Sequence, residues 1–153
     1  MAHILKRIQI LPTDLDTAWK FFSNPRNLDE ITPDDLKFEI VHLDSEIMFP
    51  GQMIHYRIQI FPGIWKTWIT EITLIEDKIR FVDNQCIGPY ALWHHEHRFE
   101  ICDEGVRMTD EVHYHIGFGI FGEIAHSLFV RKMLKHIFNY RTKVIGEHFV
   151  NPS

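Results

Sequence analysis

Between residues 36 and 115 the sequence predicts six strands in succession, and this run constrains the fold more than any other feature. The expected strands cover residues 36–43, 52–60, 64–75, 78–86, 90–101 and 106–115. Short turn sequences such as Pro62-Gly63 and Glu104-Gly105 separate them. Links this short join antiparallel neighbours, because a parallel crossover needs a dozen or more residues. The run therefore predicts an antiparallel meander.

The segment before this run predicts one more strand and two short helices. Residues 3–11 alternate loosely and stop at a proline, which indicates a strand. Residues 14–22 carry apolar side chains at spacings of three and four, so we expect a short helix capped by Thr13 or Asp14. A second short helix is expected at residues 26–31.

The last third of the chain predicts one long helix over residues 121–149. It contains no proline, and one stripe recurs every three or four residues: Ile124, Leu128, Arg131, Leu134, Phe138, Arg141 and Ile145. A curved antiparallel sheet must bury one face, and only this helix is large enough to cover it. We therefore predict a single α+β domain, residues 1–153, in which a curved seven-stranded antiparallel sheet wraps around the C-terminal helix. A gap between sheet and helix is the expected site.

Composition and charge exclude several function classes. The formal net charge of −5 argues against a nucleic-acid partner, since phosphate binding needs a basic surface. No run of 18 apolar residues exists, so we expect no membrane insertion and a cytoplasmic location. Cys86 and Cys102 show no metal-ligand spacing and are expected to be reduced structural thiols. We expect no cofactor, and a monomer or homodimer.

The stretch 88–100 concentrates aromatic rings and histidines. Because successive side chains of a strand point to opposite faces, Trp93, His95, His97, Phe99 and Ile101 share one face. This set is large and mostly apolar, so we assign it to the interior, while His94 belongs to the charged outer set. Two imidazoles are therefore expected to point into the cavity.

Hairpin registers place further polar groups beside them. Across the turn at 103–105, Asp110 is expected beside His97, and a similar estimate sets Asp83 near His95. A two-residue turn at Glu76-Asp77 would set Trp68 near Gln85, Thr70 near Asp83 and Ile72 near Phe81. The candidate ligand-binding residues are Tyr56, Trp68, Asp83, Gln85, Trp93, His95, His97, Asp110 and Tyr114.

Three interpretations of the inward polar groups stay open. They can satisfy one another as a structural network, anchor a ligand, or act as a general acid and base. A functional metal is not expected, because strand parity divides the histidines and no HExxH motif is present. The GxGxxG match at 117–122 lacks the second strand of a dinucleotide fold, so these glycines are expected to turn the last strand into the helix.

Three segments carry a resemblance to a known superfamily. They are Trp19-Lys20-Phe21-Phe22-Ser23-Asn24-Pro25-Arg26-Asn27-Leu28, Phe81-Val82-Asp83-Asn84-Gln85 and Gly88-Pro89-Tyr90. With the element order, they resemble the helix-grip superfamily often labelled SRPBCC, which includes START lipid-transfer domains, the birch pollen allergen, plant hormone receptors and polyketide cyclases. Within it the chain is most similar to small bacterial ligand-binding proteins described as cell-division-inhibitor-like. The resemblance implies a helix-grip fold with an apolar ligand cavity, and no catalytic residue is carried over.

The expected function is binding of an apolar, aromatic or lipid-like small molecule between sheet and helix, for transport or sensing. The first alternative is an enzyme of the aromatase/cyclase or dehydratase kind that uses the cavity His and Asp side chains as acid and base. The second is an interaction module with a filled core and no ligand.

Overall fold

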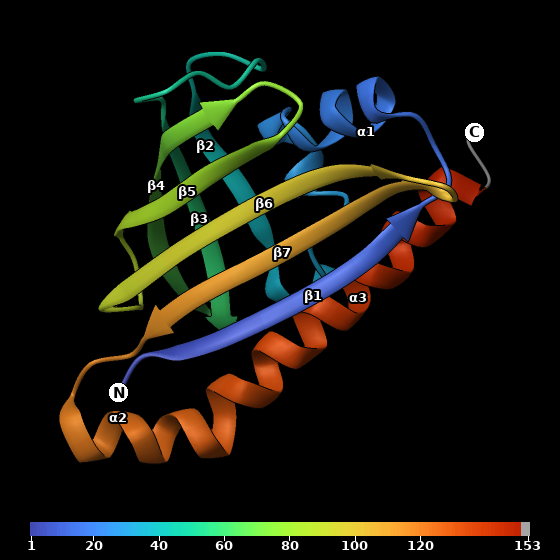
Figure 1. Ribbon diagram of the computed structural model, residues 1–153. Helices are drawn as coiled ribbons and strands as arrows, with labels where there is room; N and C mark the ends of the chain where they lie inside the picture. The colour runs from blue at the N-terminus through green and yellow to red at the C-terminus, as the bar shows by residue number, and fades with distance from the viewer. Residues whose placement is uncertain (151–153) are drawn as a thin grey trace.

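The computed structural model describes residues 1–150, apart from the side chains of residues 60 and 61, and confirms the predicted α+β fold (Figure 1). Residues 151–153, the end of the expected domain, lie outside the described residues. Seven strands form one antiparallel sheet in the order β1-β7-β6-β5-β4-β3-β2. Their bounds are β1 His3–Leu11, β2 Phe38–Leu43, β3 Met53–Phe61, β4 Ile64–Glu76, β5 Arg80–Ile87, β6 Leu92–Cys102 and β7 Gly105–His115.

The sheet curves around the C-terminal helix, and the first strand completes its edge. β1 pairs with β7 from His3↔Tyr114 to Leu11↔Val106, so the first and the last strand of the chain lie side by side (Figure 1). Leu11 and Val106 are almost fully buried in the core at one end of this pair. This closure leaves β1 and β2 as the two edge strands.

Short helices cover one end of the sheet after β1. Helix α1, Leu15–Phe22, is capped by Asp14, whose Oδ1 accepts a hydrogen bond from the Thr17 amide at 2.8 Å. The second predicted helix, at 26–31, is instead a single 3-10 turn, η1, Pro25–Leu28. Pro25 sits in its first turn and the Asn24 side chain caps it. A further 3-10 turn, η2, covers Asp34–Leu36.

The register between β4 and β5 differs from the prediction. Thr70 pairs with Gln85 and Ile72 with Asp83, a shift of two residues, while Ile75 takes the place opposite Phe81. The turn holds three residues instead of two, because Lys78 adopts a left-handed conformation with φ of 57° and Glu76 pairs with Arg80. A bulge in β4 between Ile72 and Leu74 moves the register back by one residue, and at a second irregularity, beside Ile69 and Thr70, the extra residue lies in β5.

The C-terminal helical stretch is continuous from α2, Gly119–Ala125, through the π-turn η3, His126–Val130, to α3, Arg131–Val150. Leu134, Phe138 and Ile145 are buried as predicted, but Ile124 and Leu128 are about half exposed. The π-turn adds one residue and so rotates the stripe by about 100°. In Figure 1 the α2 end also extends past the strands, where no sheet covers it.

Three glycines join β7 to α2. Gly117 and Gly119 take positive φ values of 85° and 53°, which favour glycine. A Cβ on Gly122 would lie 1.7 Å from the carbonyl oxygen of Gly117, so the helix approaches this turn too closely for any side chain. Within residues 1–150 no helix has the length and apolar character needed to span a membrane.

Candidate functional site

A cavity of about 160 Å³ lies between the inner face of the sheet and α3. Its walls are mainly apolar and aromatic. The sheet supplies Tyr56, Trp68 and Trp93, and α3 supplies Leu134 and Phe138. Trp68 and Trp93 meet edge to face with ring centroids 5.2 Å apart, which fixes this part of the wall.

Three ionisable side chains on neighbouring strands also line the cavity. Asp83 on β5 pairs with His95 on β6, and His97 follows His95 on the same face. Both predicted neighbours, Asp83 beside His95 and Asp110 beside His97, are confirmed by the register. In β6 the inner residues from Trp93 to Phe99 are buried, whereas Ile101, also assigned to the interior, is 75% exposed beside the β6–β7 turn.

Two carboxylates hold the two imidazoles. Oδ2 of Asp83 lies 2.9 Å from Nε2 of His97 and 3.6 Å from Nδ1 of His95. Oδ1 of Asp110 lies 3.0 Å from Nε2 of His95 and 2.9 Å from Nδ1 of His97. The last contact is short but lacks hydrogen-bond geometry, so Nδ1 of His97 has no hydrogen-bond partner within residues 1–150. Phe81 stacks on His97 at 4.2 Å and fixes its ring.

The four groups shift one another's pKa values in opposite directions. Burial alone would lower the pKa of His97, but its contacts with Asp110 and Asp83 outweigh burial and raise that pKa to about 9. Burial and the neighbouring His97 charge lower the pKa of His95. The pKa values of Asp83 and Asp110 are lowered, since hydrogen bonds and the histidine charges outweigh burial. These shifts favour the cationic form of His97 and the neutral form of His95.

Arg141 on α3 is a site residue that the sequence pattern assigned only to the helix stripe. It lines the cavity, and its guanidinium lies 5.0 Å from the centre of the Phe138 ring. Among residues 1–150 no carboxylate lies within 4.0 Å of it, and its buried Nε has no hydrogen-bond partner. Burial lowers its pKa. The signal that could have pointed to it is a charged residue in a mostly apolar stripe, although Arg131 in the same stripe is exposed.

Of the nine predicted ligand-binding residues, six line the cavity and three lie outside its wall. Tyr56, Trp68, Asp83, Trp93, His95 and His97 line the cavity, whereas Gln85, Asp110 and Tyr114 do not. Gln85 bonds the backbone of Tyr90 with both ends of its amide, at 2.7 and 3.2 Å, and so orders the β5–β6 link. Asp110 lies behind the two histidines, and the Tyr114 hydroxyl bonds Nε2 of His126 at 2.9 Å.

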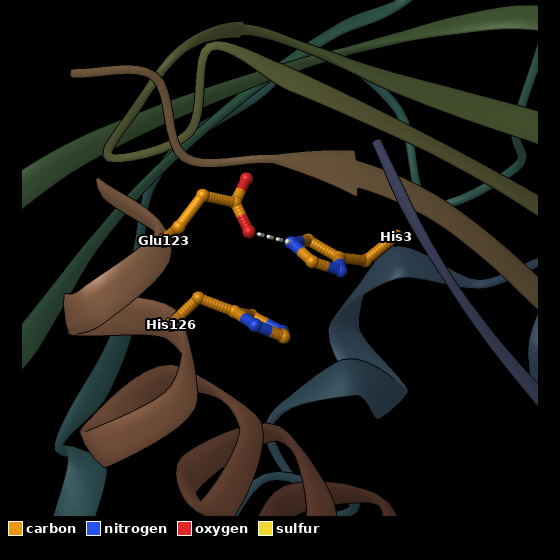
Figure 2. A group of neighbouring side chains, drawn as sticks. All are labelled: His3, Glu123 and His126. Atoms are coloured by element: carbon orange, nitrogen blue, oxygen red, sulfur yellow. Dashed lines mark ion pairs between the residues drawn. The ribbon is translucent and has the colours of Figure 1, made fainter. Parts of the chain in front are cut away.

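A second group of potential ligands lies where β1 meets the C-terminal helix (Figure 2). It consists of His3, Glu123 and His126, with 3.3 Å between Nε2 of His3 and Oε2 of Glu123. The two imidazoles stack almost in parallel, with centroids 3.6 Å apart and 11° between the planes. Ring lone pairs lie in the ring plane, so parallel stacked rings cannot direct them at one ion without turning.

No protein-family model and no curated protein matches the chain. Solved structures do match it along most of its length. Protein CV1439 from Chromobacterium violaceum has a TM-score of 0.71 at 10% identity, covering 95% of this chain and 96% of that one. The protein TTHA0849 from Thermus thermophilus has 0.64 at 18%, covering 98% and 97%. Ara h 8.0201 has 0.63 at 17%, covering 95% and 98%.

These likenesses are to proteins of low sequence identity, so they concern the fold alone. Ara h 8.0201 has the helix-grip fold of the birch pollen allergen. The chain is similar to it in the curved seven-stranded sheet, the short helices after the first strand and the long C-terminal helix. The helix-grip architecture is thus shared.

Proposed function

We propose that the chain binds a small, largely apolar molecule in the cavity between the sheet and α3, and that it belongs to the SRPBCC superfamily. The observation that carries this proposal is the presence of Asp83, His95, His97 and Arg141 in the wall of a mainly apolar, aromatic cavity. Apolar walls with a few convergent polar groups are typical of small-molecule sites. The cytoplasmic location and the monomer or homodimer are part of the same proposal.

The cavity volume limits the size of the ligand. Pockets for drug-sized molecules usually hold about 300 Å³ or more, whereas an apolar cavity of about 150 Å³ can accept benzene. A cavity of about 160 Å³ therefore favours a single substituted aromatic ring over a lipid chain. Trp68 and Trp93 offer edges and faces for such a ring.

Arg141 favours a ligand with an oxygen at one end. Its guanidinium has no ion pair among the described residues, and a partly buried cation whose buried Nε has no partner is costly. A phenolic, carbonyl or carboxylate oxygen would accept its hydrogen bonds. The ligand class is thus a ring with a hydrogen-bond-accepting group.

The test is a titration of the protein with phenol and with toluene in the presence of a chelator. Binding is measured by the change in fluorescence of the cavity tryptophans. The variant Leu134→Trp fills the cavity and should abolish the response, with circular dichroism as the check of folding. Leu128→Trp makes the same change on the exposed part of the helical stretch and should leave it intact. Equal binding by both variants, or no binding by the wild type and no ligand in native mass spectrometry, would contradict the proposal and favour an interaction module.

A second candidate is acid–base catalysis on the bound molecule. The pKa values of His95 and His97 are shifted in opposite directions, which is the arrangement that separates a general base from a general acid. Gain or loss of water by a ligand that copurifies from the native host would support this candidate. The reaction should stop in His95→Gln while the ligand still binds.

A further inference from the structure

We propose that Asp83, His95 and His97 bind one divalent first-row transition metal ion, of the zinc class, at the floor of the cavity. The proposal concerns the same cavity as the proposed function, but it does not require an organic ligand to be present. Carboxylate and imidazole are ligands of catalytic zinc, which takes three protein ligands and keeps one position open, and two histidines with one carboxylate also hold iron with several open positions.

The ligand atoms are close enough for one ion. One ligand atom from each of Asp83, His95 and His97 lies within 4.8 Å of the other two. Oδ2 of Asp83 is 2.9 Å from the nearer histidine nitrogen and 3.6 Å from the other. Bonds of about 2.1 Å in a tetrahedral site separate ligand atoms by about 3.4 Å, so the two distances bracket the required one.

The backbone explains why these three side chains converge. His95 and His97 are two residues apart on one strand, so both point inward. Asp83 stands directly opposite His95 on the neighbouring strand. The imidazole rings of His95 and His97 lie 3.7 Å apart and are tilted by 34°, against 11° between the stacked rings of His3 and His126 (Figure 2), so a smaller rotation of the rings would direct both nitrogens at one ion.

Asp110 occupies the position of an outer partner. It does not line the cavity, and it accepts a hydrogen bond from Nε2 of His95 at 3.0 Å. It also lies 2.9 Å from Nδ1 of His97. The nitrogens left over, Nδ1 of His95 and Nε2 of His97, are the two that face Asp83. Metal-bound histidines usually donate their other N–H to a carboxylate, a backbone carbonyl or water, as His95 does to Asp110 here.

If only hydrogen bonds connect Asp83, His95 and His97, one of the two histidine nitrogens that face Asp83 has no partner. Among the described residues Nδ1 of His95 makes no hydrogen bond, because Oδ2 of Asp83 is 3.6 Å away. An ion between these atoms would use both and release the proton on Nε2 of His97 to solvent. With two carboxylates, Arg141 and a divalent ion, the site would carry one net positive charge, which an anionic oxygen on the open side would offset.

The experiment uses untagged protein that has been stripped with a chelator and dialysed. Co²⁺ titration followed by visible absorption, and Zn²⁺ titration by calorimetry, should both give one ion per chain. His95→Ala and Asp83→Ala should weaken binding at least 100-fold. Asp110→Asn should weaken it about 10- to 100-fold, the usual effect of losing an outer partner.

Two variants serve as matched controls. His94→Ala changes the outer face of the same strand, and His126→Ala removes a ligand of the second group. Neither should change the affinity or the cobalt spectrum. The proposal is overturned if the wild type binds no ion, or if His94→Ala or His126→Ala abolishes binding while His95→Ala does not.

Anomalous scattering from a zinc-soaked crystal of the wild type gives an answer even where a variant does not fold. Density between Asp83, His95 and His97 supports the proposal, and zinc found only elsewhere overturns it. Phenol binding measured with chelator present is a separate result. Its loss would contradict the proposed function alone, whereas a missing ion beside intact phenol binding would contradict the metal site alone.

Discussion

Asp110 lies directly opposite His97 in the β6–β7 register, with its Oδ1 2.9 Å from Nδ1 of the imidazole. The same oxygen is 3.0 Å from Nε2 of His95, so one carboxylate contacts both inward histidines. Both side chains are buried, Asp110 at 6% and His97 at 8% exposure. The same buried pair therefore links two strands of the sheet and lies beside the cavity.

Replacement of Asp110 tests how strongly this pair stabilises the fold. Asp110→Asn leaves the His97 cation buried with one carboxylate fewer, and loss of one partner of a buried pair typically costs about 3 to 5 kcal/mol. We expect the free energy of unfolding to fall by about 3 kcal/mol, measured by urea denaturation at neutral pH with chelator present. Asp103→Asn, at the exposed β6–β7 turn, should stay within about 0.5 kcal/mol. A similar small change for Asp110→Asn would show that the pair contributes little.

Stability should also fall on the alkaline side. The pKa of His97 is raised to about 9 in the folded protein, because its carboxylate contacts outweigh burial, and an unfolded histidine titrates near about 6.5. The folded state therefore holds the proton more tightly, and the stabilisation is complete below about 6.5 and lost as the pH rises through about 9.

The melting temperature of the protein, measured with chelator present across this pH range, tests the expected fall in stability. His97→Gln removes the titrating group and should flatten the decline, whereas His94→Gln, on the outer face of the same strand, should keep it. A decline of the same slope in both variants would mean that another group causes it.

Most of the site prediction rested on the alternation of side chains between the two faces of a strand. The alternation along β6 placed His95 and His97 inward, and short turns set Asp83 and Asp110 beside them. The predicted β4–β5 register was wrong, because a left-handed Lys78 lengthens the turn by one residue and because β4 and β5 each carry a bulge. Neither feature has a strong sequence signal, since lysine rarely adopts this conformation.

The helix side of the site was harder to predict. The position of Arg141 in the cavity depends on how α3 is rotated about its axis. That rotation depends on the π-turn η3, which the spacing of apolar residues did not predict. Arg141 was therefore part of a helix stripe without a role. A charged side chain on a buried stripe is in general a reason to look for its partner across the core.

Arg141 should discriminate among ligands by their oxygen. We expect Arg141→Gln to weaken benzoate and phenol binding several-fold more than toluene binding, because only the first two accept hydrogen bonds from the guanidinium. Competition titrations with chelator present measure the affinities for the three probes. The control Arg131→Gln changes an exposed arginine at the start of α3 and should affect none. Equal weakening of all three probes by Arg141→Gln would indicate a packing role.

Two helical glycines should respond to alanine in opposite ways. A Cβ on Gly122 would lie 1.7 Å from the Gly117 carbonyl oxygen and 2.9 Å from its carbon, both backbone atoms that cannot swing away. Gly122→Ala must therefore move α2 away from the end of β7, and we expect a loss of about 2 kcal/mol or more in unfolding free energy.

Gly146, inside α3, is the matched control. Its added Cβ would meet only the end of the Gln9 side chain, at an ordinary 3.6 Å. Alanine in a helix interior is favoured over glycine by about 0.5 to 1 kcal/mol, so Gly146→Ala should stabilise the protein by a comparable amount. Urea denaturation of both variants gives the comparison. A stable Gly122→Ala protein would mean that the turn from β7 into α2 can open without cost, and that the close approach of α2 is not required by the fold.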